Sequence, residues 1–111
     1  MNARETIKQQ ISSNTILLYM KGVPSAPEGG DSARVTQAVM SCGEKFTHID
    51  VLCDPDIRAE LPKYANWPNV PQLWVNGEFV GGAETIIEMF ETGELQTLIK
   101  AAAAKAKQQG A

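Results

Sequence analysis

The chain has 111 residues, a net charge of −3 and ordinary apolar and charged fractions of 43% and 21%. These values are typical of one globular domain over residues 1–111 and argue against a disordered chain. A mildly acidic chain lacks the basic surface that nucleic-acid binding needs, and no apolar run approaches the roughly 20 residues of a membrane span. The N-terminal residues lack the apolar stretch of a secretory signal. With two cysteines and no CxxC motif, we expect a cytoplasmic protein with reduced thiols.

The first part of the chain predicts a helix followed by a buried strand. Helix formers run from Ala3 to Ile11, and Ile7 lies one turn before Ile11, so both can face a core. The run TILLYM, Thr15–Met20, is short, apolar and rich in strand formers, which favours a strand buried on both faces. A loop rich in glycine and proline follows over residues 22–30.

A second helix and a second strand are predicted next. Asp31 or Ser32 offers an N-cap side chain, and the helix should run to about Ser41, with Gly43 as its C-terminal stop. The alternating run FTHIDVL, residues 46–52, predicts the second strand.

The next segment predicts a third helix and a hairpin. Asp54 or Asp56 should open the helix around Pro55, because proline is tolerated at the first helical positions. In VPQLWVNGEFVGG, two strand-like runs flank Asn76-Gly77, a dipeptide that fits a type I′ hairpin turn. Trp67, after the third helix, is interpreted as a core residue.

The C-terminal part predicts two more helices. The first spans Glu84–Thr92 and is broken by Gly93, and the second spans Leu95–Lys107. We expect the C-terminal tail, residues 101–111, to fray. The first two strands are joined through a helix, which implies a parallel pair, and the hairpin is antiparallel. The prediction is an α/β fold with a mixed four-stranded sheet and helices on both faces.

This order of elements, together with three motifs, resembles the monothiol glutaredoxins of the thioredoxin superfamily. The motifs are LYMKG at residues 18–22, DIRAELPKYANWP at 56–68 and NVPQLWVNGEFVGG at 69–82, and the resemblance covers residues 5–100. It implies a thioredoxin-like fold with about five helices. It also implies a glutathione-linked function in iron–sulfur cluster handling.

The resemblance assigns a glutathione-binding role to residues at matching positions. Lys21 and Arg58 match cations that meet glutathione carboxylates, and Val70-Pro71 matches a valine–cis-proline pair that binds its cysteine part. Gly82, Ala83 and Glu84 match a glycine–glycine–X–aspartate segment at a helix start that holds the γ-glutamyl end, with glutamate in place of aspartate. These groups complement the two carboxylates and one amine of glutathione.

One stretch departs from the family pattern. The family has Cys-Gly-Phe-Ser where this chain has Gly29-Gly30-Asp31-Ser32. In the family this cysteine attacks disulfides as a thiolate, and it ligates a 2Fe–2S cluster together with a glutathione thiolate between two subunits. Glycine can do neither, so no catalytic residue and no metal ligand are predicted. Asp31 places a carboxylate at the helix N-terminus, which should weaken glutathione binding.

Neither cysteine of the chain is an obvious replacement for the missing thiol. Cys42 follows the second helix, about 20 Å from Gly29 at ~1.5 Å rise per residue, and is interpreted as a buried apolar residue. Cys53 is interpreted as a loop residue, partly exposed.

Three hypotheses remain open. The chain is a binding module that either binds glutathione weakly or docks a partner such as a BolA-like protein. Alternatively, it is an active cluster carrier or oxidoreductase that uses Cys42 or Cys53, or it is an altered copy of an ordinary monothiol glutaredoxin. Without a bridging cluster we expect a monomer.

Overall fold

A computed structural model describes residues 2–110 of the chain, with side chains through Lys107. None of the helices in this described part is long and apolar enough to cross a membrane. The elements, in chain order, are α1 (Ala3–Ser13), β1 (Ile16–Met20), β2 (Gly22–Val23), β3 (Ala26–Pro27), α2 (Gly30–Ser41), β4 (Thr47–Asp50), the 3₁₀ turn η1 (Val51–Cys53), α3 (Pro55–Ala65), β5 (Gln72–Val75), β6 (Glu78–Gly81), α4 (Ala83–Thr92) and α5 (Glu94–Gly110).

The main sheet has four strands in the order β4-β1-β5-β6. β1 and β4 are parallel, as expected for strands joined through a helix, and β5 is antiparallel to both of its neighbours. Asn76 and Gly77 both have positive φ between β5 and β6, which agrees with the predicted type I′ turn. The predicted mixed four-stranded sheet and the thioredoxin-like fold are confirmed.

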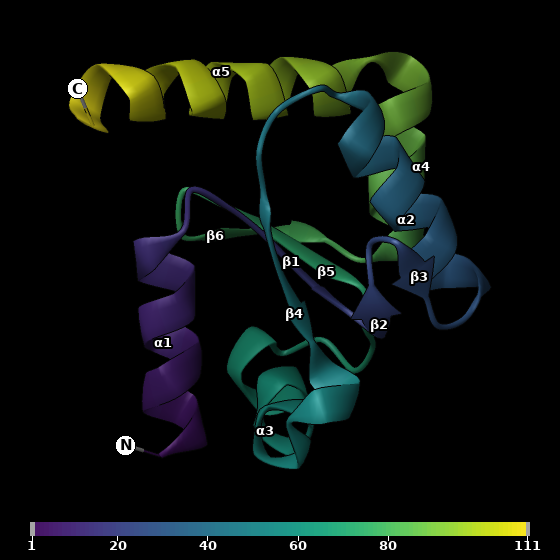
Figure 1. Ribbon diagram of the computed structural model, residues 1–111, viewed down its shortest axis with the longest axis vertical. Helices are drawn as coiled ribbons and strands as arrows, with labels where there is room; N and C mark the ends of the chain where they lie inside the picture. Colours follow the sequence, from purple (N-terminus) through teal and green to yellow (C-terminus); the bar gives the residue numbers. More distant parts are fainter. Residues whose placement is uncertain (1, 111) are drawn as a thin grey trace.

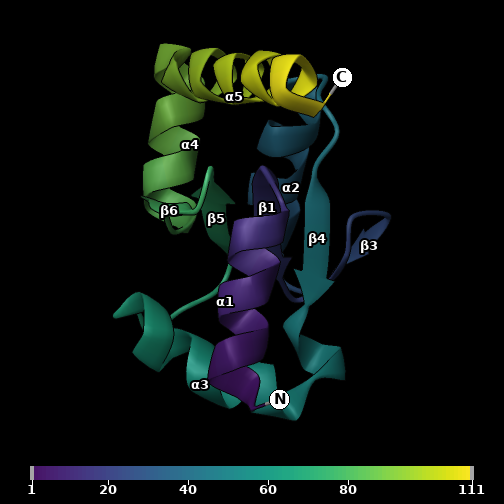
Figure 2. The same cartoon turned by 90° about the vertical axis from the view of Figure 1, so that its left-hand side faces the viewer.

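Helices cover both faces of the sheet (Figures 1 and 2). α2, α4 and α5 pack on one face, where the apolar cluster includes Leu18 and Met20 of the central strand β1. α1 and α3 pack on the other face against Leu17 and Tyr19, the alternate residues of the same strand. Because successive side chains of a strand point to opposite faces, a fully buried strand of this kind serves two cores at once.

The start of α2 corrects a prediction. The N-cap is Gly29 and carries no side-chain cap, so the prediction that Asp31 or Ser32 caps this helix was wrong. Both residues lie inside the first turn, where Asp31 pairs with Arg34 and the Ser32 hydroxyl accepts a hydrogen bond from the backbone of Lys21. The preceding loop also contains a short antiparallel pair, β2 and β3, which the sequence did not predict.

The second strand is shorter than predicted, because the chain turns into η1 after Asp50. The Asp50 carboxylate caps this turn by accepting a hydrogen bond from the Leu52 amide at 2.9 Å. The start of α3 is as predicted: Asp54 is the N-cap and Pro55 the first helical residue. The last helix extends past the predicted Lys107 to Gly110, so the predicted tail continues α5 as far as the structure describes it.

Candidate functional site

The residues predicted to bind glutathione come from segments that meet at one end of the sheet. β1 ends here beside the start of β5, and Met20 pairs with Asp50 at the end of β4. β6 also ends here, because Gly81 pairs with Leu73 near the start of β5. The segments that enter or leave the sheet at this end carry Lys21, Gly29, Arg58, Val70, Pro71, Gly82, Ala83 and Glu84.

Lys21 is held by its backbone between β1 and the loop that leads to α2. Its amide donates to the Ser32 hydroxyl at 3.2 Å, and its carbonyl accepts from the Glu28 amide at 2.8 Å. The next residue, Gly22, donates its amide to the Asp50 carboxylate at 2.9 Å. The loop is therefore tied to both α2 and the end of β4, while the Lys21 side chain stays partly exposed.

Gly29 adopts a backbone conformation that other residues rarely reach. Its φ of 92° and ψ of 154° fall in a region occupied almost only by glycine. No atom lies within 4 Å of the position that a Cβ would take, so space is not what limits this site.

Asp31 lies on the first turn of α2 and lines a hollow of about 450 Å³ between α2 and α4. It forms a long ion pair with Arg34, 4.0 Å from Oδ1 to Nη1. The hollow holds four carboxylates and one guanidinium, so its potential is negative; its lining residues are Asp31, Arg34, Ala83, Glu84, Ile87, Glu88 and Glu91. A ligand with net negative charge meets repulsion on this side of the site.

The Val70-Pro71 peptide bond is cis, as the resemblance implied, and it directly precedes β5. Pro71 is buried, and Val70 is partly exposed at the surface. Because β5 starts beside the end of β1, the pair lies at the same end of the sheet as Lys21.

Gly82 is the N-cap of α4 and is buried beneath an aromatic side chain. A Cβ on Gly82 would lie 2.6 Å from the Trp67 indole nitrogen, so the ring packs directly on the glycine backbone. Trp67 also stacks against Phe79 with ring centroids 5.8 Å apart, yet it remains 39% exposed. The interpretation of Trp67 as a core residue was therefore wrong, since it covers Gly82 at the surface and belongs to neither apolar cluster.

α2 and α4 both begin without a side-chain cap. Unpaired amides at a helix start, together with the helix dipole, attract anionic groups such as a carboxylate. At both starts the first turn carries its own acid, Asp31 in α2 and Glu84 in α4. Any bound carboxylate must share these positive ends with a fixed negative charge.

Cys53 lies closer to this site than its position in the sequence suggested. Its thiol donates to the Asp50 carboxylate at 3.3 Å, and the same carboxylate holds the Gly22 amide. The hydrogen bond to Asp50, together with the charge of that carboxylate, raises the pKa of the Cys53 thiol. A thiol held in its protonated form is a poor nucleophile at neutral pH.

Cys42 is buried at the opposite end of α2, where it caps the helix and bonds the Ala38 carbonyl. Burial raises the pKa of its thiol. An iron–sulfur cluster needs thiolate ligands at one place, and the two cysteines of the chain lie at different places, neither of them in residues 21–41. The donor set of the site therefore does not fit a cluster of the usual kind.

Comparison with known proteins identifies the family. The glutaredoxin family model matches residues 16–80. The chain is 61% identical to Glutaredoxin 4 of Escherichia coli (strain K12) over 103 residues, which cover 93% of this chain and 90% of the relative. The chain belongs to the glutaredoxin family.

Solved glutaredoxins share its fold. The solution structure of reduced poplar apo GrxS14 superposes with a TM-score of 0.75 at 33% identity, covering 89% of this chain and 91% of that one. A buckwheat glutaredoxin, solved as a glutathione complex, superposes with a TM-score of 0.77 at 21% identity, covering 90% and 89%. The resemblance to the monothiol glutaredoxins is thereby confirmed.

In this glutaredoxin, then, the fold brings all the predicted site residues to one end of the sheet. Two further contributors were not predicted: Trp67, which covers Gly82, and Arg34, which faces the acidic hollow. Trp67 lies in the quoted motif ANWP but has no apolar periodicity that would reveal its contact. Arg34 could have been paired with Asp31 from their spacing of three residues along a helix.

Proposed function

We propose that this glutaredoxin is a glutathione-binding module that does not perform thiol redox chemistry or 2Fe–2S ligation. The observation that carries the proposal is the loop before α2, where Gly29 occupies the N-cap in a glycine-specific conformation and no thiol is available. The other residues that the resemblance assigns to glutathione binding are present in the chain, and the cis Val70-Pro71 bond supports the proposal.

The proposed binding is weak, for an electrostatic reason. Lys21 and Arg58 supply two positive charges for the two carboxylates of glutathione, and Glu84 supplies an acid for its amine. Asp31 opposes this arrangement, because it adds a negative charge at the helix start nearest to the missing thiol. The buckwheat protein of the same fold has been solved with glutathione, which supports glutathione as the ligand class.

A glutathione titration followed by backbone amide NMR tests the groove. We expect the amides of Lys21, Val70 and Glu84 to shift together and to saturate at millimolar concentration or tighter. Arg58→Gln should weaken binding about tenfold, because a charge-assisted hydrogen bond is lost. Arg4→Gln is the matched control, since Arg4 pairs with Glu60 on a different part of the surface. If no amide moves, the groove is not functional and this proposal fails.

Reconstitution with iron, sulfide and glutathione tests the loss of chemistry. The protein should stay colourless, and the double variant Gly29→Cys with Asp31→Phe should gain a glutathione-dependent 2Fe–2S chromophore. A stable chromophore in the unaltered protein would contradict the proposal.

A second candidate function is cluster ligation or disulfide reduction with Cys53 as the thiol. The observation that favours it is the short path from Cys53 through Asp50 to Gly22, beside Lys21. The raised pKa of the Cys53 thiol weighs against it. A chromophore or a disulfide-reducing activity that disappears in Cys53→Ser but persists in Cys42→Ser would establish this function in place of the first.

The proposal also concerns the oligomeric state of the protein and its binding partner. A chain that ligates no bridging cluster should be a monomer, free to bind a partner such as a BolA-like protein through the same end of the sheet. Sedimentation without added metal checks this expectation, and a stable dimer would contradict it.

A further inference from the structure

A cavity of about 680 Å³ lies between the start of β1, the loop from α2 to β4 and the second half of α5. It is at the opposite end of the sheet from the glutathione groove, because Ile16 begins β1 and Lys21 follows its last residue. Its residues are Thr15, Ile16, Gly43, Glu44, Lys45, Ala103, Ala106 and Lys107. None of them belongs to the groove described above.

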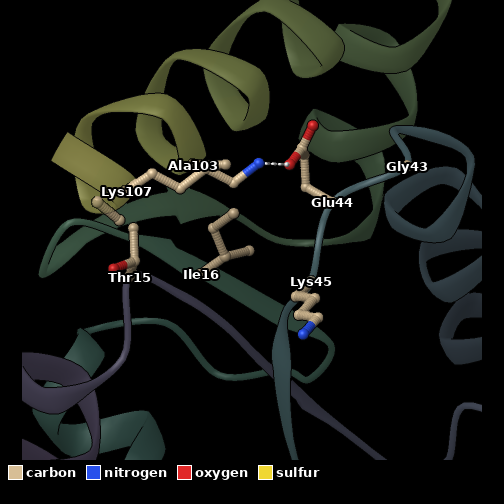
Figure 3. Close-up of a pocket in the computed structure, with 8 residues that line it drawn as sticks. Thr15, Ile16, Gly43, Glu44, Lys45, Ala103 and Lys107 are labelled. Carbon is tan, nitrogen blue, oxygen red and sulfur yellow. Dashed lines mark ion pairs between the residues drawn. The ribbon is translucent and has the colours of Figure 1, made fainter. Parts of the chain in front are cut away.

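The cavity exists because the residues of α5 that face the sheet become small. Early in the helix, Leu95 and Ile99 fill the apolar core beside β1. Beyond them, the residues over the cavity are Ala103 and Ala106, whose methyl groups leave the space above Ile16 unfilled. In Figure 3 the Ile16 side chain points toward α5 across this space. The two walls facing each other are therefore apolar.

The rim of the cavity carries a positive balance of charge. Glu44 pairs with Lys100 at 3.7 Å and with Lys107 at 4.0 Å, so its carboxylate is already shared by two lysines. Lys45 follows on the same loop, is exposed and turns away from Glu44 in Figure 3. Among the side chains that the structure describes, Lys45 forms no ion pair, so it is available to an outside anion.

We propose that this cavity is a binding site for a small amphipathic monocarboxylate. Its apolar body would lie between Ile16 and the two alanines, and its carboxylate would meet Lys107 and the Lys45 side chain, which must turn in from its position in Figure 3. The volume is in the range of about 300–1,000 Å³ that small-molecule sites occupy. A cationic ligand fits less well, because Lys45 and Lys107 repel it and Glu44, the acid that lines the cavity, is already shared by two lysines.

The test uses octanoate as the probe and octylammonium as a matched probe with the same chain and the opposite charge. In amide NMR, octanoate should shift Ile16, Glu44 and Ala106 in a saturable way and bind roughly fivefold tighter than octylammonium, the size expected of partly exposed ion pairs. Acetate, which has the same head and no chain, should not saturate. Equal binding of the two eight-carbon probes, or no saturable shift with octanoate up to the order of 10 mM, would overturn the proposal.

Two pairs of variants localise the binding. Ala106→Leu fills the cavity and should abolish octanoate binding, whereas Ala104→Leu, on the exposed side of the same helix, should leave it unchanged. Lys45→Gln should weaken octanoate several-fold without affecting octylammonium, and Lys105→Gln is its control. If Ala106→Leu binds octanoate like the unaltered protein, or if Lys45→Gln changes both probes equally, the site is not the one proposed. Glutathione titration of Ala106→Leu should remain normal, which separates this site from the groove.

Discussion

α2 and α4 begin in nearly the same way, and yet their cap glycines are needed for different reasons. Each helix has a glycine N-cap, no side-chain cap and an acid in its first turn. Gly29 is exposed, has positive φ and has no atom near its missing Cβ. Gly82 is buried, has an ordinary φ of −94° and lies against the Trp67 ring. Glycine is therefore needed at the start of α2 for its backbone conformation, and at the start of α4 because a side chain would clash with Trp67.

The difference has a consequence for substitution. Strain from a positive φ stays with the residue whatever its neighbours are, because it arises within the residue itself. A clash with a ring depends on the ring, so it can be relieved by a second substitution. Substitutions at the two glycines should separate strain from packing, and substitutions at the nearby acids should separate their effects on glutathione binding and on pH dependence.

Gly82→Ala should have the largest effect on stability. The new methyl would overlap the Trp67 indole, which packs against Phe79. Overpacking of this kind lowers the free energy of unfolding by about 1–3 kcal/mol. Urea unfolding of a double-mutant cycle with Trp67→Ala checks the cause. The cost of the methyl should largely vanish once the ring is removed. A cost that persists in the Trp67→Ala background would show that packing is not the reason for this glycine.

Gly29→Ala should cost about 1–2 kcal/mol, because the alanine must hold a glycine-specific backbone conformation or distort the loop. The control is Gly30→Ala, one residue later and inside α2, which should be neutral or stabilising by about 0.5 kcal/mol. Thermal unfolding of the two variants gives the comparison. Equal melting temperatures would mean that the loop changes its conformation at no cost.

The two acids at the helix starts should affect glutathione binding in opposite directions. Asp31→Asn removes a charge that repels the ligand and should tighten binding about 2–5-fold, the range expected of a charge at an exposed helix start. Glu84→Gln removes the acid proposed to meet the amine and should weaken binding by a similar factor. Isothermal calorimetry measures both, with Glu91→Gln as a control from the far end of the same hollow. Changes of the same sign would refute the proposed orientation of glutathione.

Lowering the pH should destabilise the loop before α2, which Asp50 holds through the Gly22 amide, at a higher pH than the start of α4. Hydrogen bonds from the Gly22 amide, and secondarily from Leu52 and Cys53, hold the pKa of Asp50 below its ordinary value. The stabilisation from Asp50 is therefore complete above the pKa of an unfolded aspartate and is lost as the pH falls through the lower pKa of the folded state. Amide exchange at Gly22, corrected for intrinsic rates, should accelerate in this range, while the amide of Ile86, in the first turns of α4, should not. Asp50→Asn should remove the pH dependence.

Most of the fold could be predicted because its signals are local. The buried strand TILLYM, the Asp54-Pro55 helix start and the Asn76-Gly77 turn each contain within a few residues the chemistry that determines their structure. The short pair β2 and β3 was missed since its strands have two residues each and no measurable alternation. The N-cap of α2 was misplaced because the usual capping side chains were present. Ser32 instead accepts a hydrogen bond from the distant backbone of Lys21, and Asp31 pairs with Arg34 inside the helix.

The candidate site was predictable only in part. Its residues followed from the resemblance, and the fold then explained why they meet at one end of the sheet. The contact of Trp67 with Gly82 depends on tertiary packing, which no spacing in the sequence encodes. The hydrogen bond of Cys53 to Asp50 is local, but it depends on the turn η1, which lies where the sequence predicted a strand. The backbone conformation of Gly29 could not be predicted from the sequence either, because glycine is compatible with every backbone conformation.

The contacts of α5 imply that its two halves respond to different solution conditions. The first half is attached by buried leucine and isoleucine, whereas the later turns contribute only Ala102 and Ala103 to the apolar cluster and carry Lys107, which shares Glu44 with Lys100. Mobile ions screen such exposed pairs over about 8 Å at physiological ionic strength, and they leave apolar packing almost untouched. Rising ionic strength should therefore release the end of α5 from the loop at Glu44 while the core stays folded. The position of the last turns of this helix relative to the loop at Glu44 would then depend on ionic strength.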